Sequence, residues 1–214
     1  FVDHFALPWA AGRAWGLVGQ NPYDPAMVQI AEDTISDSGY LGQLPQEKIL
    51  IHPLVNFFFF LPFSLIPYPI SRAIWVVILG IFIVLTVIIS LRFSERELSG
   101  LGKVGNIALL FLWFPGIYSL LTGHLSPLLI FLMVFGLWSI KLGNYQRAGF
   151  ILSLTAGSLP LTLFILILAF LWSVARKQWS YVIAYLSGFA FLVTVSVLML
   201  PSWPLDWLRT VVGT

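Results

Sequence analysis

Carboxylate side chains, which can act as general bases, are concentrated at one end of this 214-residue chain. The stretch from Leu98 to Leu205 contains no Asp or Glu. Six of the nine acidic residues instead fall within residues 1–50: Asp3, Asp24, Glu32, Asp33, Asp37 and Glu47. We therefore expect any carboxylate chemistry to come from the opening segment.

The chain as a whole is too apolar for a water-soluble globular domain. Hydrophobic residues make up 59% of the sequence and charged residues 9%, against about 45–50% and about 25% in soluble domains. Mean hydropathy is +0.93. The net charge of +2 lies in short basic clusters between apolar runs, which indicates membrane orientation rather than nucleic-acid binding. No cysteine is present, and three histidines without a spaced partner form no metal motif, so we predict neither a metal site nor a cofactor.

Apolar runs long enough to cross a membrane follow one another along the body. A spanning helix needs about 20 apolar residues. Residues 148–175 are apolar but too long for one span, and Gly157, Ser158 and Pro160 interrupt them, so a hairpin of two short helices is expected. The predicted transmembrane helices are 70–91, 104–121, 125–140, 148–158, 161–175 and 181–200.

The distribution of Lys and Arg predicts which side each connection faces. Seven of the eleven basic residues lie in the connections 92–103, 141–147 and 176–177. The positive-inside rule places these connections in the cytoplasm and the acidic opening outside. The apolar run Ile51–Ile66 then cannot be an ordinary span, and its prolines favour an interfacial or re-entrant helix.

These expectations define three regions of an integral, multi-pass plasma-membrane protein. Residues 1–69 form an outer loop with juxtamembrane or re-entrant helices, residues 70–200 form the transmembrane bundle, and residues 201–214 begin a further outer loop. The chain starts at Phe1 and stops soon after an apolar run, so we interpret it as a fragment of a larger membrane protein.

Motifs spread in order along nearly the whole chain resemble those of glycosyltransferase family 87. The opening run from Asp3 to Trp15 and the following Gly19-Gln20-Asn21-Pro22-Tyr23-Asp24 resemble the first outer loop of that family. Further matching segments are His52-Pro53-Leu54, Leu65-Ile66-Pro67-Tyr68, Ala73-Ile74-Trp75, Thr122-Gly123-His124-Leu125-Ser126, Ala148-Gly149 to Pro160, and Arg176-Lys177-Gln178-Trp179. The chain departs from the family pattern at His124 and Ser126, which replace Gln and Asn, and at Leu159, which replaces Lys.

The resemblance implies an all-α, polytopic membrane helix bundle of the GT-C class. Such an enzyme is an inverting, mannosyltransferase-like glycosyltransferase of the cell envelope. It would move a hexose from a polyprenyl-phosphate donor to a hydroxyl of a lipid or glycan acceptor at the outer membrane face, with membrane lipids around it. A lysine missing at Leu159 would remove one group that holds the lipid phosphate in relatives.

Asp3 is the predicted catalytic base, because inversion needs one general base beside the acceptor hydroxyl. It is the first acid of the matching outer loop. The structural alternative is an interfacial acid that caps a helix around Ala10–Leu17.

The remaining candidates are predicted to bind substrate, and all but His4 have a structural alternative. Arg13 can pair with a lipid phosphate or with an acid of its own loop. Tyr23 and Asp24 can contact the sugar or acceptor, or build a turn with Asn21 and Pro22. His52 and His124 can donate hydrogen bonds to phosphate or sugar, or lie unengaged at the interface. His4 is also predicted to bind substrate. We expect Asp3, Arg13, His52 and His124 to line one outward-facing groove.

Two other functional classes fit parts of the sequence. A transporter or lipid flippase would use the broken hairpin at a mid-membrane site. Against this, the predicted spans hold no acid for an ion relay. A non-catalytic membrane protein could retain the fold while lacking the lysine at position 159.

Overall fold

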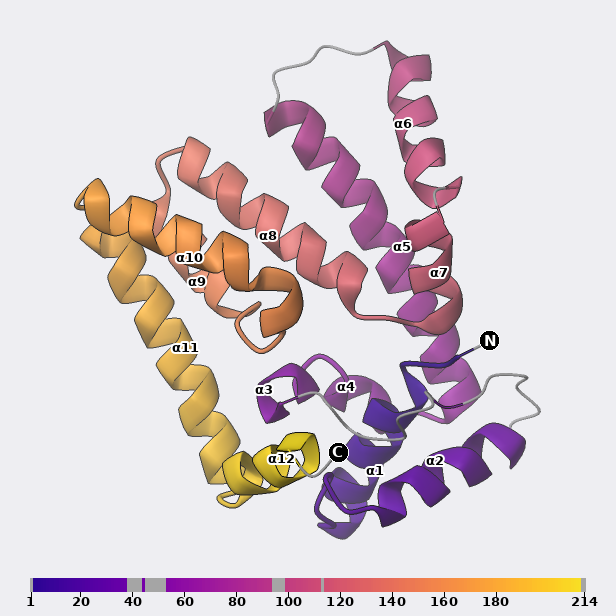
Figure 1. Ribbon diagram of the computed structural model, residues 1–214. Helices are drawn as coiled ribbons and strands as arrows, with labels where there is room; N and C mark the ends of the chain where they lie inside the picture. Colours follow the sequence, from indigo (N-terminus) through magenta and orange to yellow (C-terminus); the bar gives the residue numbers. More distant parts are fainter. Residues whose placement is uncertain (1, 38–43, 45–52, 94–98, 113, 213–214) are drawn as a thin grey trace. The chain divides into compact units, whose positions relative to one another are not determined.

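The computed structural model describes residues 2–37, 44, 53–93, 99–112 and 114–212, and within these ranges the secondary-structure elements are helices, with no strand (Figure 1). The all-α class expected of a membrane helix bundle is therefore confirmed. In chain order the helices are α1 Ala6–Val18, α2 Ala26–Asp37, α3 Leu54–Phe57, α4 Leu61–Ser64, α5 Tyr68–Phe93, α6 Gly100–Leu112, α7 Phe114–Thr122, α8 Ser126–Lys141, α9 Tyr145–Ser153, α10 Leu159–Ala175, α11 Trp179–Met199 and α12 Trp203–Val212.

Two of the described helices are long and apolar enough to cross a bilayer. They are α5, with 26 residues, and α11, with 21. Only 22% of the most apolar stretch of α5 and 28% of that of α11 are buried inside the protein. The core helix of a soluble protein would be mostly buried, so these apolar surfaces are suited to contact with lipid.

The breaks between helices coincide with residues that cannot continue a helix or that start one well. The apolar stretch 148–175 is divided, since α9 ends at Ser153 and α10 begins at Leu159. Proline occupies one of the first two positions of α4, α8 and α10, where its missing N–H costs no hydrogen bond. In the stretch 51–66, the described residues form the single-turn helices α3 and α4.

The chain divides into two compact units, each described here by itself. Unit 1 comprises Phe1–Ile78, Tyr118–His124 and Val195–Thr214, and unit 2 comprises Leu79–Ile117 and Leu125–Thr194. Unit 1 therefore contains α1 to α4, the first turns of α5, the end of α7 and α12.

Aromatic side chains build the core of unit 1. The Trp75 ring lies 5.6 Å from the ring of Phe5, 5.1 Å from Phe60 and 5.2 Å from Phe63, measured between centroids. Trp9 of α1 is also buried, and its indole N–H donates to the carbonyl oxygens of Phe63, at 3.0 Å, and Ile66, at 3.2 Å. These contacts attach α1 to the α4 region and to the start of α5.

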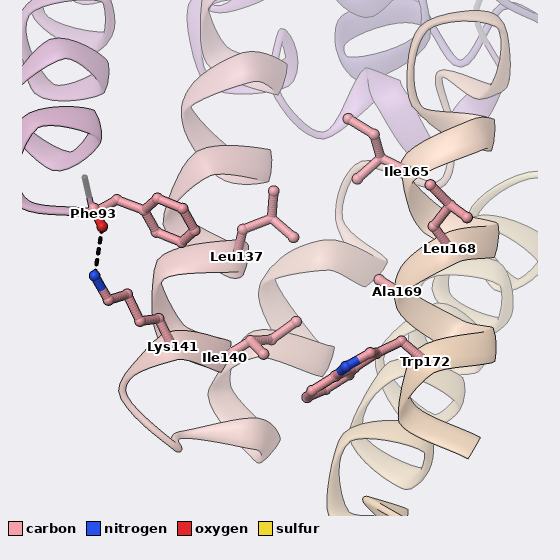
Figure 2. A pocket seen from close by; sticks show the side chains of 8 residues that line it. All are labelled: Phe93, Leu137, Ile140, Lys141, Ile165, Leu168, Ala169 and Trp172. Carbon is pink, nitrogen blue, oxygen red and sulfur yellow. Dashed lines mark hydrogen bonds between the residues drawn. The ribbon is translucent and has the colours of Figure 1, made fainter. Parts of the chain in front are cut away.

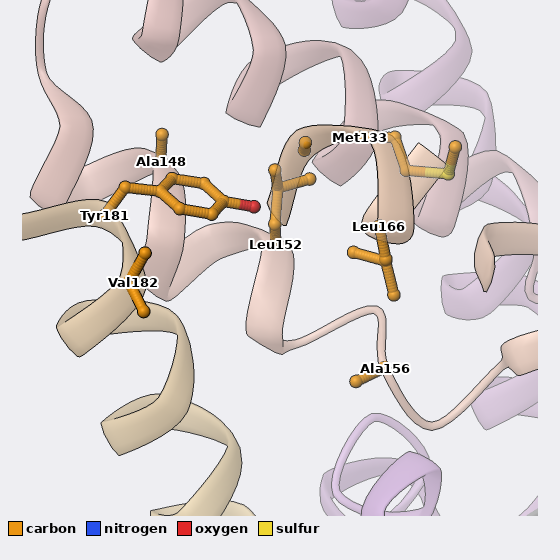
Figure 3. Close-up of a cluster of buried hydrophobic side chains, with 8 residues drawn as sticks. Met133, Ala148, Leu152, Ala156, Leu166, Tyr181 and Val182 are labelled. Carbon is orange, nitrogen blue, oxygen red and sulfur yellow. The ribbon is translucent and has the colours of Figure 1, made fainter. Parts of the chain in front are cut away.

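Small residues allow the helices of unit 2 to pack closely. The core of this unit comprises Met133, Ala148, Leu152, Ala156, Leu166, Ala169, Tyr181 and Val182 (Figure 3). A Cβ atom on Gly136 would come within 2.6 Å of Leu152 Cγ. A Cβ atom on Gly149 would collide with the backbone carbonyl of Tyr181, so α9 and α11 are in backbone contact at this point. Close approach through small residues is the usual way in which helices associate in lipid.

Replacing Gly149 with Ala is expected to destabilise the protein by about 1–3 kcal/mol, because the backbone of α11 cannot yield as a flexible side chain would. The measurement is thermal unfolding of the purified protein in detergent. Gly105→Ala is the matched control: it lies within α6 with nothing within 4 Å of its Cβ position, so the higher helix propensity of Ala should preserve or raise stability. Equal unfolding temperatures for the two variants would contradict the backbone contact.

Candidate functional site

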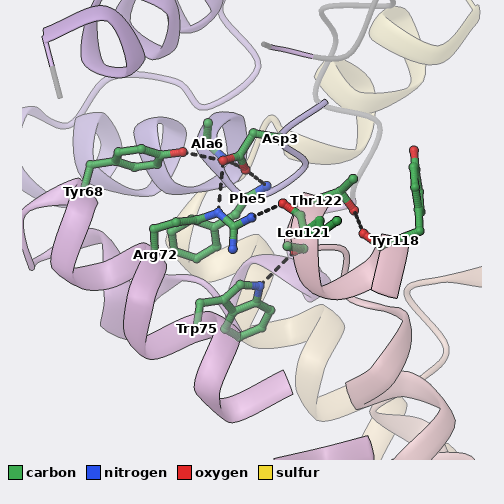
Figure 4. A network of polar contacts seen from close by, with 10 residues as sticks. Asp3, Phe5, Ala6, Tyr68, Arg72, Trp75, Tyr118, Leu121 and Thr122 are labelled. Carbon is green, nitrogen blue, oxygen red and sulfur yellow. Dashed lines mark hydrogen bonds and ion pairs between the residues drawn. The ribbon is translucent and has the colours of Figure 1, made fainter. Parts of the chain in front are cut away.

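Asp3 lies at the centre of a buried polar network in unit 1 (Figure 4). Its Oδ1 atom accepts hydrogen bonds from the backbone N–H groups of Phe5, at 2.8 Å, and Ala6, at 3.1 Å, and so fixes the turn that enters α1. Its Oδ2 atom accepts from the Tyr68 hydroxyl at 2.6 Å and from Arg72 Nε at 3.0 Å. The carboxylate is 0% exposed, so these four donors and the Arg72 charge replace its hydration.

Arg72 connects this carboxylate with the end of α7. Its side chain is 6% exposed, and its Nη2 atom donates to the Leu121 carbonyl at 2.7 Å. One turn further along α5, the Trp75 indole N–H donates to the Gly123 carbonyl at 2.9 Å. The start of α5 therefore holds both the opening segment and the segment around residue 122.

Gly123 has a conformation and a location that exclude a side chain. Its φ angle is +67°, in the left-handed region, and a Cβ atom there would lie 3.0 Å from Arg72 Cζ and from Phe5 Cβ. The central residue of the Thr122-Gly123-His124 motif therefore has to be glycine for structural reasons.

His4 and His124 lie together beside this network. The His4 backbone N–H donates to the Thr122 carbonyl at 2.8 Å, which brings the opening segment against the end of α7. The two imidazole rings are edge-to-face, with centroids 4.9 Å apart, and the ring of Tyr118 lies 6.4 Å from that of His4. Burial, and secondarily the neighbouring His4, lower the pKa of His124 to about 4. His124 is therefore neutral at physiological pH, with one ring nitrogen as a donor and the other as an acceptor.

Arg13 occupies a different environment, on the face of α1 that meets α4. Its Nη1 atom donates to the Ser64 carbonyl at 3.2 Å, and its guanidinium lies 5.4 Å from the centroid of the Trp9 ring. These contacts give Arg13 a packing role between α1 and α4.

Tyr23 and Asp24 belong to a turn between α1 and α2. Asn21 Oδ1 accepts from the Tyr23 N–H at 3.0 Å, and Asp24 Oδ1 accepts from the Ala26 N–H at 2.9 Å, at the start of α2. Asn21 Nδ2 donates to Asp206 Oδ2 of α12 at 2.8 Å. Burial and the nearby Asp206 raise the pKa of Tyr23, so its hydroxyl keeps its proton.

The structure thus brings together three of the predicted site residues: Asp3, His4 and His124. Arg13, Tyr23 and Asp24 make their described contacts with other groups, and His52 lies outside the described residues. Sequence reasoning missed Tyr68 and Arg72 as members of the site. The available signal was Arg72 itself, a single cation near the start of a 26-residue apolar helix, since an ionisable residue in such a segment normally has a partner.

Fold and site together define a membrane-embedded helical protein with a buried carboxylate–arginine pair, and two half-buried histidines beside it, at one end of a long apolar helix. The chain belongs to glycosyltransferase family 87, whose family model matches residues 50–214. It is accordingly a membrane glycosyltransferase. Arg72 and His124 lie within the matched range, whereas Asp3 and His4 precede it. Neither the curated proteins nor the solved structures provided a match to the chain.

Replacing Arg72 with Met is expected to cost about 3–5 kcal/mol of stability, because it leaves the Asp3 carboxylate buried without its counter-charge. The cost is measured by thermal unfolding in detergent. The matched control is Arg209→Met, whose side chain is 79% exposed and lies 3.8 Å from Asp206, and there the change should be below about 1 kcal/mol. The double variant Asp3→Asn/Arg72→Met should lose less than the sum of the two single changes. Similar small losses for the two Arg variants would argue against the buried pair.

Replacing His124 with Gln is expected to weaken the dependence of stability on pH in mildly acidic solution. Between pH 6.5 and about 4 the unfolded chain binds a proton at this residue that the folded protein does not, so wild-type stability falls as the pH drops through this window. The full loss is at most about 3 kcal/mol. Thermal unfolding of wild type and variant at pH 7, 5.5 and 4 measures this loss of stability, as the difference between the two proteins.

His4→Gln serves as the comparison for the His124 measurement. It removes only the smaller cause of the lowered pKa, so most of the pH dependence should persist. Parallel pH profiles for wild type and His124→Gln would show that His124 is not the group that titrates.

Proposed function

We propose that this family 87 glycosyltransferase is an inverting GT-C enzyme that takes a hexose from a polyprenyl-phosphate donor. The sugar implied by the resemblance is mannose, and the acceptor is a hydroxyl of a lipid or glycan. The reaction would take place at the outer face of the plasma membrane, in which the chain would pass several times. The observation that carries this proposal is the buried Asp3 carboxylate next to the half-buried pair of His4 and His124, in a chain of this family.

In the proposed reaction, the acceptor hydroxyl oxygen forms a bond to the anomeric carbon of the sugar. The bond between that carbon and the phosphate oxygen breaks, and polyprenyl phosphate leaves with its electron pair. The proton of the acceptor hydroxyl passes to Asp3, which acts as the general base. The bonds, the proton and the electron pair balance without an oxidant, a reductant or a further reactant.

For Asp3 to accept that proton, the acceptor hydroxyl has to take the place of one of its four present donors. Two of these are backbone N–H groups at the entrance to α1, and Arg72 supplies the counter-charge. The Tyr68 hydroxyl, at 2.6 Å from Oδ2, is a neutral side-chain donor of the same chemical type as the acceptor. We therefore assign Tyr68 as the group that the acceptor replaces.

His4 and His124 are assigned to the donor phosphate or the sugar. His124 is neutral at physiological pH, so it can donate one hydrogen bond without adding a second cation to the site. In this proposal Arg13 supports α1 against α4, while Tyr23 and Asp24 shape the loop. His52, from the segment before α3, remains a predicted substrate-binding residue.

The decisive experiment is transfer of labelled mannose from polyprenyl-phosphate mannose by the full-length protein in membranes, with a nucleotide-linked mannose as the comparison donor. Asp3→Asn should lower turnover at least 100-fold, because a positioned general base contributes about 10²–10⁴-fold. Tyr68→Phe should retain turnover, since it removes only the exchangeable donor. Thermal unfolding of both variants separates loss of activity from loss of fold.

Three results would contradict parts of the proposal. Near wild-type turnover of Asp3→Asn would exclude Asp3 as the base. Transfer from the nucleotide donor alone would exclude the polyprenyl-phosphate donor. A well-folded wild type that transfers no sugar from either donor would favour a non-catalytic member of the family.

A further inference from the structure

Unit 2 contains an open apolar groove that the proposed reaction does not use (Figure 2). It lies among the end of α5, α8 and α10, and its volume is about 410 Å³. Phe93, Leu137, Leu168 and Trp172 are among the side chains that form its walls. The volume falls in the range of about 300–1,000 Å³ typical of pockets that hold small molecules.

Lys141 is the one cation among the described side chains that line this groove. Lys141, in the last turn of α8, donates from Nζ to the Phe93 carbonyl at 2.5 Å, and its ammonium lies 5.3 Å from the centroid of the Phe93 ring. Figure 2 shows the hydrogen bond at the side of the groove where α5 ends. The groove thus combines apolar walls with a fixed ammonium at one end. This combination is complementary to a molecule that has an apolar chain and an anionic head.

The charge of the neighbouring connections favours an anionic head. The segments 92–103, 141–147 and 176–177 together hold seven basic residues and two acidic ones, a net charge of +5. These are the connections that the positive-inside rule assigns to the cytoplasm. The cytoplasmic leaflet carries anionic phospholipids, and basic pockets between transmembrane helices on that side bind their headgroups.

We propose that this groove binds one anionic phospholipid of the inner leaflet, with an acyl chain along Leu137, Leu168 and Trp172 and the phosphate on Lys141. Such a site shares no residue with the Asp3 cluster of unit 1 and does not depend on which sugar is transferred. The apolar walls disfavour a soluble anion, which would gain only the contact with Lys141.

Native mass spectrometry of the full chain released from nanodiscs tests this site. The nanodiscs contain equal amounts of phosphatidylglycerol and phosphatidylcholine with the same acyl chains. The wild type should retain phosphatidylglycerol in preference to phosphatidylcholine. Lys141→Gln should reduce this preference about five-fold, because one basic residue near a membrane surface contributes about 1 kcal/mol. Lys141→Arg, which keeps the positive charge, should retain the wild-type preference for phosphatidylglycerol.

Two matched controls separate the charge and the shape of the groove. Arg209→Gln removes an exposed arginine of α12 that lies outside both the groove lining and the basic connections, and should leave the preference unchanged. Leu168→Trp narrows the groove at a side chain that is 50% exposed and should reduce retention of both lipids. Leu171→Trp makes the same change at a side chain of α10 that is 59% exposed but outside the lining, and should retain lipid as the wild type does.

Several outcomes would overturn the proposal. One is an unchanged preference in Lys141→Gln, and another is equal lipid loss in Leu168→Trp and Leu171→Trp. Retention of no lipid by the wild type would also exclude the site. Displacement of phosphatidylglycerol by an equal amount of polyprenyl phosphate would show that the groove holds a prenyl chain instead. Helix content measured by circular dichroism confirms in each case that the variant is folded.

Discussion

The buried pair of Asp3 and Arg72 is the interaction on which the structure of unit 1 depends. A carboxylate that is 0% exposed requires a counter-charge and hydrogen-bond donors, and here they come from residues far apart in sequence. The same pair determines where the turn before α1, the first turns of α5 and the end of α7 meet. His4 and His124 are neighbours because that meeting point brings residue 4 to residue 122.

The class of fold was predictable from the sequence because bilayer thickness limits the length of apolar runs and prolines mark the starts of several helices. The site was predictable only in part. Asp3 was singled out as the first acid of the family-like outer loop, but its partners lie 65 and 69 residues away, and no local pattern pairs them. Arg72 lies outside the basic connections assigned to the cytoplasm, and nothing in the sequence marked it as a partner of Asp3. His124 was recognised from its motif, whereas its lowered pKa depends on burial that a sequence does not show.

Glycine has different physical roles in the two units. At Gly123 the backbone adopts a positive φ angle beside Arg72, so that the network around Asp3 can close. At Gly149 the backbone is helical, and the missing Cβ allows α9 to approach α11. Both glycines lie in motifs that resemble family 87. The first supports the polar cluster and the second supports the helix packing.

The lengths of α8 and α10 have a consequence for the membrane itself. With 16 and 17 residues, these helices span roughly 24–26 Å at about 1.5 Å per residue, less than a hydrocarbon core of about 30 Å. α5, with 26 residues, exceeds that thickness and would tilt. In the proposed multi-pass arrangement, hydrophobic mismatch at α8 and α10 would thin the adjacent bilayer at a cost of a fraction of a kcal/mol per Å, which would favour thinner membranes.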